Sequence, residues 1–251
     1  MNLYLHRRDS LNYLINYKLN TMSALTDKKF NSQASIVNTF AEFLSNDDIK
    51  NEPMFFNSGY DFAMKNGGEI TRSFLSALPY NWKKSKIVFD SRIHMLMPGW
   101  YPAIPGWHHD DVPRKEIPVG QHFVTAGQPD YENPRYKSEH ILGLVNADIC
   151  PTYFAIGECS MPAIPEGELI YRKWHEVVEG LVKNEELELI KCQDRKMYNF
   201  DWQTFHTGSK TVGNGWRWFG RVSRNTERVE KITNEIRVNS QVYLEFPMEG
   251  W

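Results

Sequence analysis

Short runs in which apolar and polar residues alternate, and which proline or glycine then interrupts, constrain the fold of this chain more than any other feature. At residues 86–97, polar Arg92 and His94 alternate with apolar neighbours, and Pro98-Gly99 ends the run. A period of two residues is typical of a strand with one buried face. Further runs lie at 140–146, 152–156, 187–192, 197–202, 215–223 and 241–246. About eight short strands of this kind predict an antiparallel jelly-roll barrel.

Three other segments have the spacing of helices. The longest is 23–44, where Ile36, Phe40 and Phe43 recur at i, i+4 and i+7. Further helices are predicted at 69–78 and 168–183. The fold class is therefore α+β, or mainly β, with helices flanking the barrel on its N-terminal side.

The chain length of 251 residues fits one domain. We expect a helical part at 1–85 and a jelly-roll core at 86–251, into which the helix 168–183 is inserted. Residues 113–140 contain several prolines and glycines, so we expect a long loop there that serves as a lid or binding loop.

Composition narrows the choice of partners. With 29 basic and 31 acidic residues the formal net charge is −2, so charge does not indicate nucleic-acid binding and a small-molecule partner is favoured. No apolar run is long enough to cross a membrane. The cysteines Cys150, Cys159 and Cys192 form no C-x-x-C pair and predict reduced, buried thiols in a cytoplasmic protein. Nothing in the sequence indicates an oligomeric state.

Residues 1–21 carry Arg7, Arg8 and Lys18 against a single Asp9, a composition that weakly resembles a transit segment. A plain N-terminal helix, or translation that starts at Met22, is the favoured interpretation.

The segment Trp107-His108-His109-Asp110-Asp111 contains two overlapping H-x-D triplets, His108/Asp110 and His109/Asp111. On an extended chain residues i and i+2 point the same way, so either pair could present an imidazole and a carboxylate to one cavity. A third ligand is needed to hold a metal, and His206 is the best candidate. Two histidines and one carboxylate with open positions are typical of non-haem iron(II) oxygenases.

Downstream, Arg217, Phe219, Arg221 and Ser223 share one face of the predicted strand 215–223. A buried guanidinium is costly unless an anion neutralises it, and its planar fork fits a carboxylate. The two arginines could instead pair with Asp201 or other acids as a structural network. His94 on the strand 86–97 either faces the cavity or is a hydrogen-bonded wall residue, and Arg92 is treated in the same way.

Other candidates are weaker. Met95, Met97, Trp100, Trp107, Trp216 and Trp218 could form an apolar cavity wall or simply belong to the core. His122, His140 and His175 look like surface or loop residues. The basic residues of 221–237 are interleaved with glutamates, which favours a solvated face over a phosphate-binding surface.

The order H-x-D, then a distal histidine, then an arginine eleven residues later resembles the 2-oxoglutarate-dependent iron(II) dioxygenase superfamily. The strand that leads through Pro-Gly into Trp-His-x-Asp is most similar to its phytanoyl-CoA dioxygenase-like branch. The resemblance implies a double-stranded β-helix of the cupin-like type, with iron(II), 2-oxoglutarate and dioxygen as cofactors and co-substrates.

Carried onto this chain, the resemblance implies that His108, Asp110 and His206 are both metal ligands and catalytic residues. It implies that Arg217 binds the distal carboxylate of 2-oxoglutarate. Arg221 with Ser223 is the second choice for that carboxylate, and His94 is a further cofactor-binding candidate. His109/Asp111 remains open as the alternative ligand pair.

Two functions follow. The first is an oxygenase, most simply a hydroxylase, because the carboxylate of Asp110 occupies the slot that a halogenase would leave to a halide. Its substrate would be a small molecule or a nucleobase or nucleotide. The alternative is a non-catalytic jelly-roll module that binds a small anion or sugar.

Overall fold

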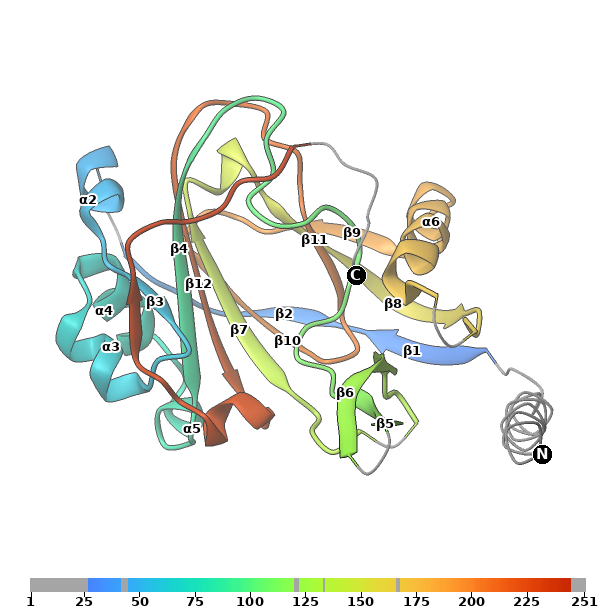
Figure 1. The fold of residues 1–251 in the computed structure, drawn as a ribbon. Helices are drawn as coiled ribbons and strands as arrows, with labels where there is room; N and C mark the ends of the chain where they lie inside the picture. Colours follow the sequence, from blue (N-terminus) through green and yellow to red (C-terminus); the bar gives the residue numbers. More distant parts are fainter. Residues whose placement is uncertain (1–26, 42–44, 120–121, 133, 166–167, 245–251) are drawn as a thin grey trace, which may run out of the picture.

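The computed structural model describes residues 27–41, 45–119, 122–132, 134–165 and 168–244, and two antiparallel sheets form most of its fold (Figure 1). The larger sheet contains, in order, β2 (Ala34–Thr39), β10 (Lys196–Asp201), β7 (Glu139–Val145), β12 (Gly215–Arg224) and β4 (Val88–Leu96). The smaller sheet contains β1 (Lys28–Ser32), β8 (Thr152–Met161) and β11 (Phe205–Gly208), and β9 (Glu188–Lys191) also pairs with β8.

Shorter elements complete the described fold. Two further two-stranded antiparallel sheets pair β3 (Met54–Phe56) with the distant β13 (Glu235–Arg237), and β5 (Arg114–Val119) with β6 (His122–Pro129). The helices are α2 (Asn46–Asn51), α3 (Tyr60–Asn66), α4 (Glu69–Ser76), α5 (Tyr80–Lys83) and α6 (Ile170–Lys183), with single 3-10 turns at Ala147–Ile149 and Glu227–Glu230. Within the described ranges, no helix combines the length and the apolar character that crossing a bilayer requires.

The strands from β4 to β12 pair in nested order. β4 pairs with β12, His108 forms an isolated bridge with His206, β7 pairs with β10, and β8 pairs with β9. Every one of these pairings is antiparallel. A chain folded back on itself in this way and wound into two sheets is compatible with a β-sandwich or jelly roll.

The strict alternation along β12 gives this strand an apolar outer face and an inner face that carries both arginines. Trp218 and Val222 lie in a core cluster on the outer face together with side chains of α3, α4 and α5. A Cβ atom on Gly220 would lie 2.1 Å from the Trp218 ring, so this position requires glycine. Arg217 and Arg221 therefore point to the inner side.

The outer face of the smaller sheet is covered by α6. Trp174 and Val178 of this helix pack with Phe30 of β1 and Phe205 of β11 in a second core cluster. Between the sheets lies a third cluster, formed by Leu142, Leu144, Ala147, Phe154, Cys192, Tyr198 and Phe200. The remaining space between the sheets is the cavity described below.

Most predicted elements are confirmed, including the helices at 69–78 and 168–183 and the strands at 86–97, 140–146, 152–156, 187–192, 197–202 and 215–223. The predicted helix 23–44 is wrong, because β1 and β2 occupy Lys28–Ser32 and Ala34–Thr39. Ile36 is 51% exposed rather than part of a buried stripe. Phe43 and residues 1–21 lie outside the described residues.

Two further expectations are corrected. The predicted loop 113–140 contains the β5–β6 hairpin, so only part of it is irregular. The predicted strand 241–246 is reduced to one bridge between Tyr101 and Tyr243, and residues 245 and 246 lie outside the described ranges.

Candidate metal centre and cavity

His108 and His206 lie directly opposite each other on adjacent extended segments. The amide of His108 donates to the carbonyl of His206 at 3.1 Å, and the amide of His206 donates to the carbonyl of His108 at 3.2 Å. Residues paired in this way project their side chains to the same side of a sheet. The two imidazole rings are 4.5 Å apart between centroids, and both residues are buried.

Asp110 completes a three-residue cluster because it follows His108 by two positions and shares its side of the chain. One ligand atom each from His108, Asp110 and His206 can be chosen such that all three lie within 4.8 Å of one another. Asp111 has a positive φ of 51°, so the extended path ends directly after Asp110.

The backbone fixes how both rings are turned. Nδ1 of His108 donates to the carbonyl of Gly106 at 2.9 Å, and Nδ1 of His206 donates to the carbonyl of Thr204 at 3.0 Å. Since a carbonyl can only accept, these contacts place the ring proton on Nδ1 and leave Nε2 to face Asp110. The Nε2 atoms lie 3.9 Å and 3.0 Å from the Asp110 carboxylate oxygens in His108 and His206, respectively.

This orientation fits a divalent cation. Histidine ligands of metals characteristically donate their second ring nitrogen to a carbonyl or carboxylate, which fixes the ring. Burial, reinforced by His206, lowers the pKa of His108 to about 4, so its ring is neutral near pH 7 and presents a lone pair. Burial would raise the pKa of Asp110, but Arg221 and His206 hold it well below its ordinary value.

The alternative pair His109/Asp111 does not form this cluster. His109 points to the opposite side, where its ring lies 3.9 Å from the ring of Phe205 between centroids. Its Nδ1 lies 2.7 Å from the hydroxyl of Tyr131. Asp111 lines the cavity but faces Arg228, with the nearest nitrogen and oxygen atoms 3.6 Å apart.

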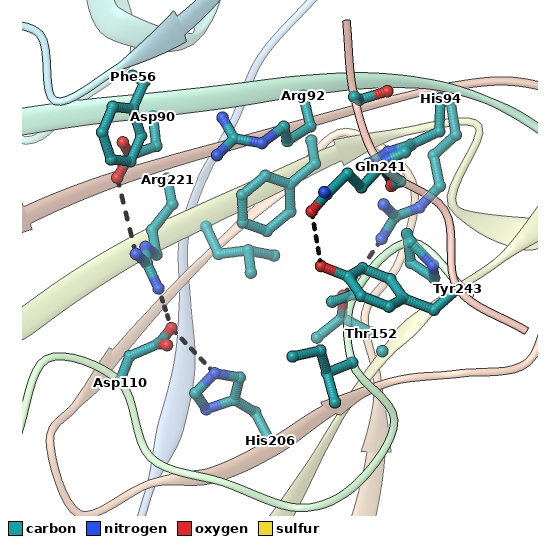
Figure 2. A pocket seen from close by; sticks show the side chains of 18 of the residues that line it. Phe56, Asp90, Arg92, His94, Asp110, Thr152, His206, Arg221, Gln241 and Tyr243 are labelled. Atoms are coloured by element: carbon teal, nitrogen blue, oxygen red, sulfur yellow. Dashed lines mark hydrogen bonds and ion pairs between the residues drawn. The ribbon is translucent and has the colours of Figure 1, made fainter. Parts of the chain in front are cut away.

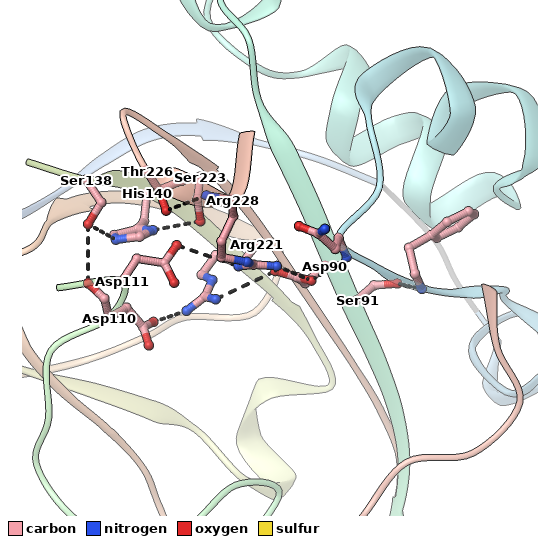
Figure 3. A network of polar contacts seen from close by, with 12 residues as sticks. Asp90, Ser91, Asp110, Asp111, Ser138, His140, Arg221, Ser223, Thr226 and Arg228 are labelled. Carbon is pink, nitrogen blue, oxygen red and sulfur yellow. Dashed lines mark hydrogen bonds and ion pairs between the residues drawn. The ribbon is translucent and has the colours of Figure 1, made fainter. Parts of the chain in front are cut away.

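A network of charges surrounds Asp110 (Figure 3). Arg221 forms an ion pair with Asp110, and its second terminal nitrogen lies 3.7 Å from Asp90. Arg228 binds both oxygens of Asp90, at 2.7 and 2.6 Å. Although burial would lower the pKa of Arg221, Asp110, Asp111 and Asp90 raise it above its ordinary value.

Arg217 stands in a different environment. It is 1% exposed, and its hydrogen bond to the Thr152 hydroxyl spans 3.3 Å. Within the described residues it has no carboxylate partner, and its Nε lacks any hydrogen-bond acceptor. Burial lowers the pKa of this guanidinium, with Cys150 and Cys192 as the neighbours that act in the other direction.

A cavity of about 620 Å³ joins these groups (Figure 2). His108, Asp110 and His206 lie on one side, and His94, Arg217 and Arg221 line its other walls. The volume lies within the range of small-molecule sites. His94 bonds through Nε2 to the Gln241 carbonyl at 3.1 Å, and burial together with Arg217 lowers its pKa to about 3.

Ser223 does not line the cavity. Its hydroxyl lies 2.8 Å from Nδ1 of His140, whose other ring nitrogen is 3.1 Å from the Ser138 hydroxyl. The prediction that His140 is a surface or loop residue is wrong, since it is 0% exposed. His175 is partly buried beside the Trp107 amide, and the side chain of His122 lies outside the described ones.

Of the two alternatives for the Trp and Met residues, the cavity wall is not found, and membership of the core holds for three tryptophans. Trp107 belongs to the cluster under α6, Trp218 and Trp216 to the cluster under α3 to α5, and Met95 and Met97 are 44% and 47% exposed. None of the six predicted Trp and Met residues lines the cavity. Cys150 and Cys192 are buried free thiols as expected, whereas Cys159 is partly exposed.

Sequence reasoning missed several cavity residues. Asp90, Phe56, Thr152, Arg228 and Arg237 line it, and the last two were assigned to a solvated face. Asp90 could have been found, because it alternates in phase with Arg92 and His94 on one strand. Phe56 and Arg237 lie on β3 and β13, whose position beside β4 no local pattern indicates.

The sequence matches no family model and no sequence among curated proteins. Among solved structures, EvdO2 from Micromonospora carbonacea var. aurantiaca, complexed with 2-oxoglutarate, is similar at 12% sequence identity with a TM-score of 0.32. The similarity covers 62% of this chain and 56% of that one, so the chain matches little more than half of the length of EvdO2. The site is therefore interpreted from its own geometry.

Proposed function

We propose that this chain is an iron(II)- and 2-oxoglutarate-dependent oxygenase that hydroxylates a small molecule, a nucleobase or a nucleotide in the cytoplasm. One observation carries the proposal. Three side chains that could hold a metal converge from two distant segments on one cavity, and a buried arginine that has no carboxylate partner among the described residues lies in the wall of the same cavity.

The donor set favours iron(II). Two imidazoles and one carboxylate leave coordination positions open, which suits a metal that must also bind a keto acid and dioxygen. A structural zinc site would instead be closed by four protein ligands. Among the described residues, the metal-binding group contains only His108, Asp110 and His206.

The two arginines divide their roles. Arg221 is already neutralised by Asp110 and Asp90, so it fixes the carboxylate ligand rather than a co-substrate. Arg217 is buried, bonds through one terminal nitrogen to the Thr152 hydroxyl and has no carboxylate partner among the described residues, and a carboxylate is the partner that its planar fork fits. We assign the distal carboxylate of 2-oxoglutarate to Arg217, with the Thr152 hydroxyl beside it.

Iron(II) with 2-oxoglutarate and dioxygen supplies an oxidation in which one oxygen atom enters a substrate C–H bond and the other enters succinate, with release of carbon dioxide. The residues of this chain hold and orient the reactants. The carbonyls of Gly106 and Thr204 hold the two imidazoles in place, and Arg221 holds the carboxylate of Asp110. The buried surroundings exclude water from the open positions.

The fold supports a finer assignment. The nested pairing of β4 with β12, His108 with His206, β7 with β10 and β8 with β9 is the order expected for a double-stranded β-helix. We further propose that the chain is most similar to the phytanoyl-CoA dioxygenase-like branch, and the Pro-Gly-linked approach to Trp-His-x-Asp is the observation that supports this finer proposal.

Anaerobic titration tests the proposal. Wild-type protein should bind one iron(II) and, on addition of 2-oxoglutarate, develop a weak visible metal-to-ligand band. With dioxygen and a suitable substrate it should form succinate. Asp110→Asn should lose more iron affinity than the roughly 10- to 100-fold that is lost when a residue that only hydrogen-bonds to a metal ligand is replaced.

Asp111→Asn is the matched control, because it makes the same chemical change one residue away, outside the cluster. It should retain iron and the visible band. If both variants bind iron as the wild type does, or if wild-type protein prepared without oxygen binds no iron, the proposal is wrong.

The alternative is a non-catalytic module that binds a small anion or sugar. The unpaired Arg217 is the observation that favours it. Tight binding of 2-oxoglutarate that is unchanged by iron(II), without the visible band, would support this alternative.

A further inference from the structure

A second group of arginines lines the cavity beside Phe56 of β3. The guanidinium carbon of Arg237 lies 3.7 Å from the Phe56 ring centroid, and those of Arg92 and Arg228 both lie 5.7 Å from it. All four residues line the same cavity as the metal-binding cluster. We call Phe56, Arg92 and Arg237 the Phe56 subsite.

Two of these three arginines lack a negative partner. Arg228 is neutralised by the bidentate contact with Asp90. Arg92 donates only to the backbone carbonyls of Phe55 and Ser91, at 3.3 and 2.8 Å. Among the described residues, neither Arg92 nor Arg237 forms an ion pair.

The two unpaired charges lie close enough to repel each other. After burial, the charge of Arg237 is the strongest influence that lowers the pKa of Arg92. A ring face attracts a guanidinium by roughly 0.5–1 kcal/mol, but it does not cancel its charge. Packing on Phe56 therefore explains how the side chains are held. The charge of Asp90 acts on the pKa of Arg92 in the other direction, but less strongly than that of Arg237, so the repulsion is offset only in part.

The charge balance of the whole cavity points the same way. Five arginines and three aspartates line it, namely Arg92, Arg217, Arg221, Arg228 and Arg237 with Asp90, Asp110 and Asp111. Counting the imidazoles as neutral, two positive charges are in excess. Iron(II) and the 2-oxoglutarate dianion cancel each other, so the excess persists in the loaded enzyme and must be met by another anion.

We propose that the substrate carries an oxyanion group, a phosphate or a carboxylate, and that Arg92 and Arg237 bind this group beside Phe56 while the carbon to be oxidised faces His206 and Asp110. As a statement about a substrate, this rests on the oxygenase function proposed above. The anion site itself does not, because it needs only the two arginines.

The cavity that Arg92 shares with the metal-binding cluster limits the size of this substrate. Arg92 is two residues from Asp90 on β4, a separation of about 6.6–6.8 Å along a strand. Asp90 in turn contacts Arg221, the partner of Asp110 (Figure 2). The anionic group and the reacting carbon therefore have to fit into one cavity of about 620 Å³, which suits a small metabolite rather than a polymer.

Calorimetric titration with two simple anions tests the subsite. Protein loaded with iron(II) and saturated with 2-oxoglutarate under nitrogen is titrated with inorganic phosphate and, separately, with acetate. We expect one additional anion per chain, and the tighter of the two identifies the oxyanion class. Arg92→Gln and Arg237→Gln should each weaken binding by about 10- to 100-fold, the cost of one lost charge-assisted contact.

Three controls separate this result from a change in fold or overall charge. Arg172→Gln, on the exposed face of α6, makes the same chemical change outside the cavity and should bind anions as the wild type does. Arg92→Lys keeps the charge and should recover part of the affinity. The affinity for 2-oxoglutarate should be unchanged in Arg92→Gln and Arg237→Gln.

A second measurement tests the substrate class. Succinate formation is compared between small carboxylic acids or phosphate esters and their matched neutral amides or alcohols. Only the anionic compound of each pair should stimulate succinate formation. In Arg92→Gln, the anionic and the neutral compound should give the same rate. If neutral compounds stimulate the enzyme equally, or if phosphate and acetate bind equally to Arg92→Gln, Arg237→Gln and Arg172→Gln, or not at all to the wild type, the proposal is wrong.

A failure of the oxygenase proposal can be told apart from a failure of the anion site, because anion binding is also measured without metal. Metal-free Arg217→Gln protein cannot anchor 2-oxoglutarate through that side chain, yet it retains the Phe56 subsite. It should still bind one phosphate or acetate, and this binding should be lost in Arg92→Gln/Arg217→Gln.

Discussion

Arg217 and Arg221 lie four residues apart on the inner face of β12, and their surroundings are opposite. Arg221 contacts the carboxylates of Asp110 and Asp90, which raise its pKa. Arg217 is more deeply buried, has no carboxylate partner among the described residues, and has a lowered pKa. The Nε atom of each arginine lacks a hydrogen-bond acceptor among the described residues, so the difference lies in the carboxylates, which pair with Arg221 and not with Arg217.

The difference between the two arginines shows how a charged side chain that stabilises the fold can be distinguished from one that binds a ligand. When one partner of a buried ion pair is removed, the other charge is left uncompensated and the folded protein is strongly destabilised. A buried charge without a carboxylate partner already carries that cost in the free protein, and an anionic ligand that binds to it relieves the cost. We therefore regard Arg221 as part of the folded framework and Arg217 as a binding residue.

The largest expected effect concerns Arg221. Arg221→Met should lower the free energy of unfolding by about 3–5 kcal/mol, because Asp110 and Asp90 lose a partner inside the protein. Urea unfolding of the metal-free protein measures this. An effect below 1 kcal/mol would mean that solvent already screens the pair, and the contrast with Arg217 would disappear.

Arg217→Met should act in the opposite way. Without ligand its free energy of unfolding should equal or exceed that of the wild type, because an apolar chain replaces an unpaired buried charge. Its affinity for 2-oxoglutarate should fall by about 2–5 kcal/mol. Saturation at about 100 times Kd should stabilise wild-type protein by about 2.7 kcal/mol, and this gain should be absent from the variant.

His94, which pairs in register with Arg217, sharpens the comparison through pH. Its pKa of about 3 lies below the ordinary 6.5, so between these values the unfolded chain binds the proton that the folded one does not. Stability from this residue is complete above pH 6.5 and is lost as the pH falls towards 3. His94→Gln should remove about 2 kcal/mol of the loss between pH 6.5 and 5.

The check is the difference in unfolding free energy between the wild type and His94→Gln at these two pH values. Since the charge of Arg217 contributes to the low pKa of His94, Arg217→Met should show part of the same reduction. Parallel pH curves for all three proteins would contradict the assignment.

The smallest effect is expected for Ser223, the neighbour of Arg221 that the resemblance offered as a carboxylate ligand. Ser223→Ala removes the hydrogen bond to His140 and should lower stability by about 1 kcal/mol. The affinity for 2-oxoglutarate should not change, because Ser223 does not line the cavity. A weakened affinity would instead support Arg221, together with Ser223, as the residues that bind the distal carboxylate of 2-oxoglutarate.

The parts of the site that follow strand alternation could be predicted from the sequence. The i, i+2 spacing correctly grouped His108 with Asp110, and the same rule placed Arg217 and Arg221 on one face of β12. Both rest on the pleat of an extended chain, which is local. The choice between His108 and His109 was not local, because it depends on the bridge to His206, almost a hundred residues away.

Distant pairing also explains the errors. Residues 28–39 form strands because β8 and β10 supply partners far along the chain, and three apolar residues at helical spacing could not reveal those partners. The bidentate contact of Arg228 with Asp90 joins positions 138 residues apart. The local sequence shows only interleaved basic and acidic residues, and this pattern wrongly predicted that Arg228 faces the solvent.

The nested pairing sets when the site can exist during synthesis. β4 pairs with β12, more than a hundred residues later, and the imidazole of His108 meets its counterpart only when residue 206 is present. A ribosome-bound chain that has not reached His206 lacks one of the three proposed metal ligands, and it also lacks the guanidinium of Arg217. Loading of the proposed metal is thereby deferred until both of these residues have been synthesised.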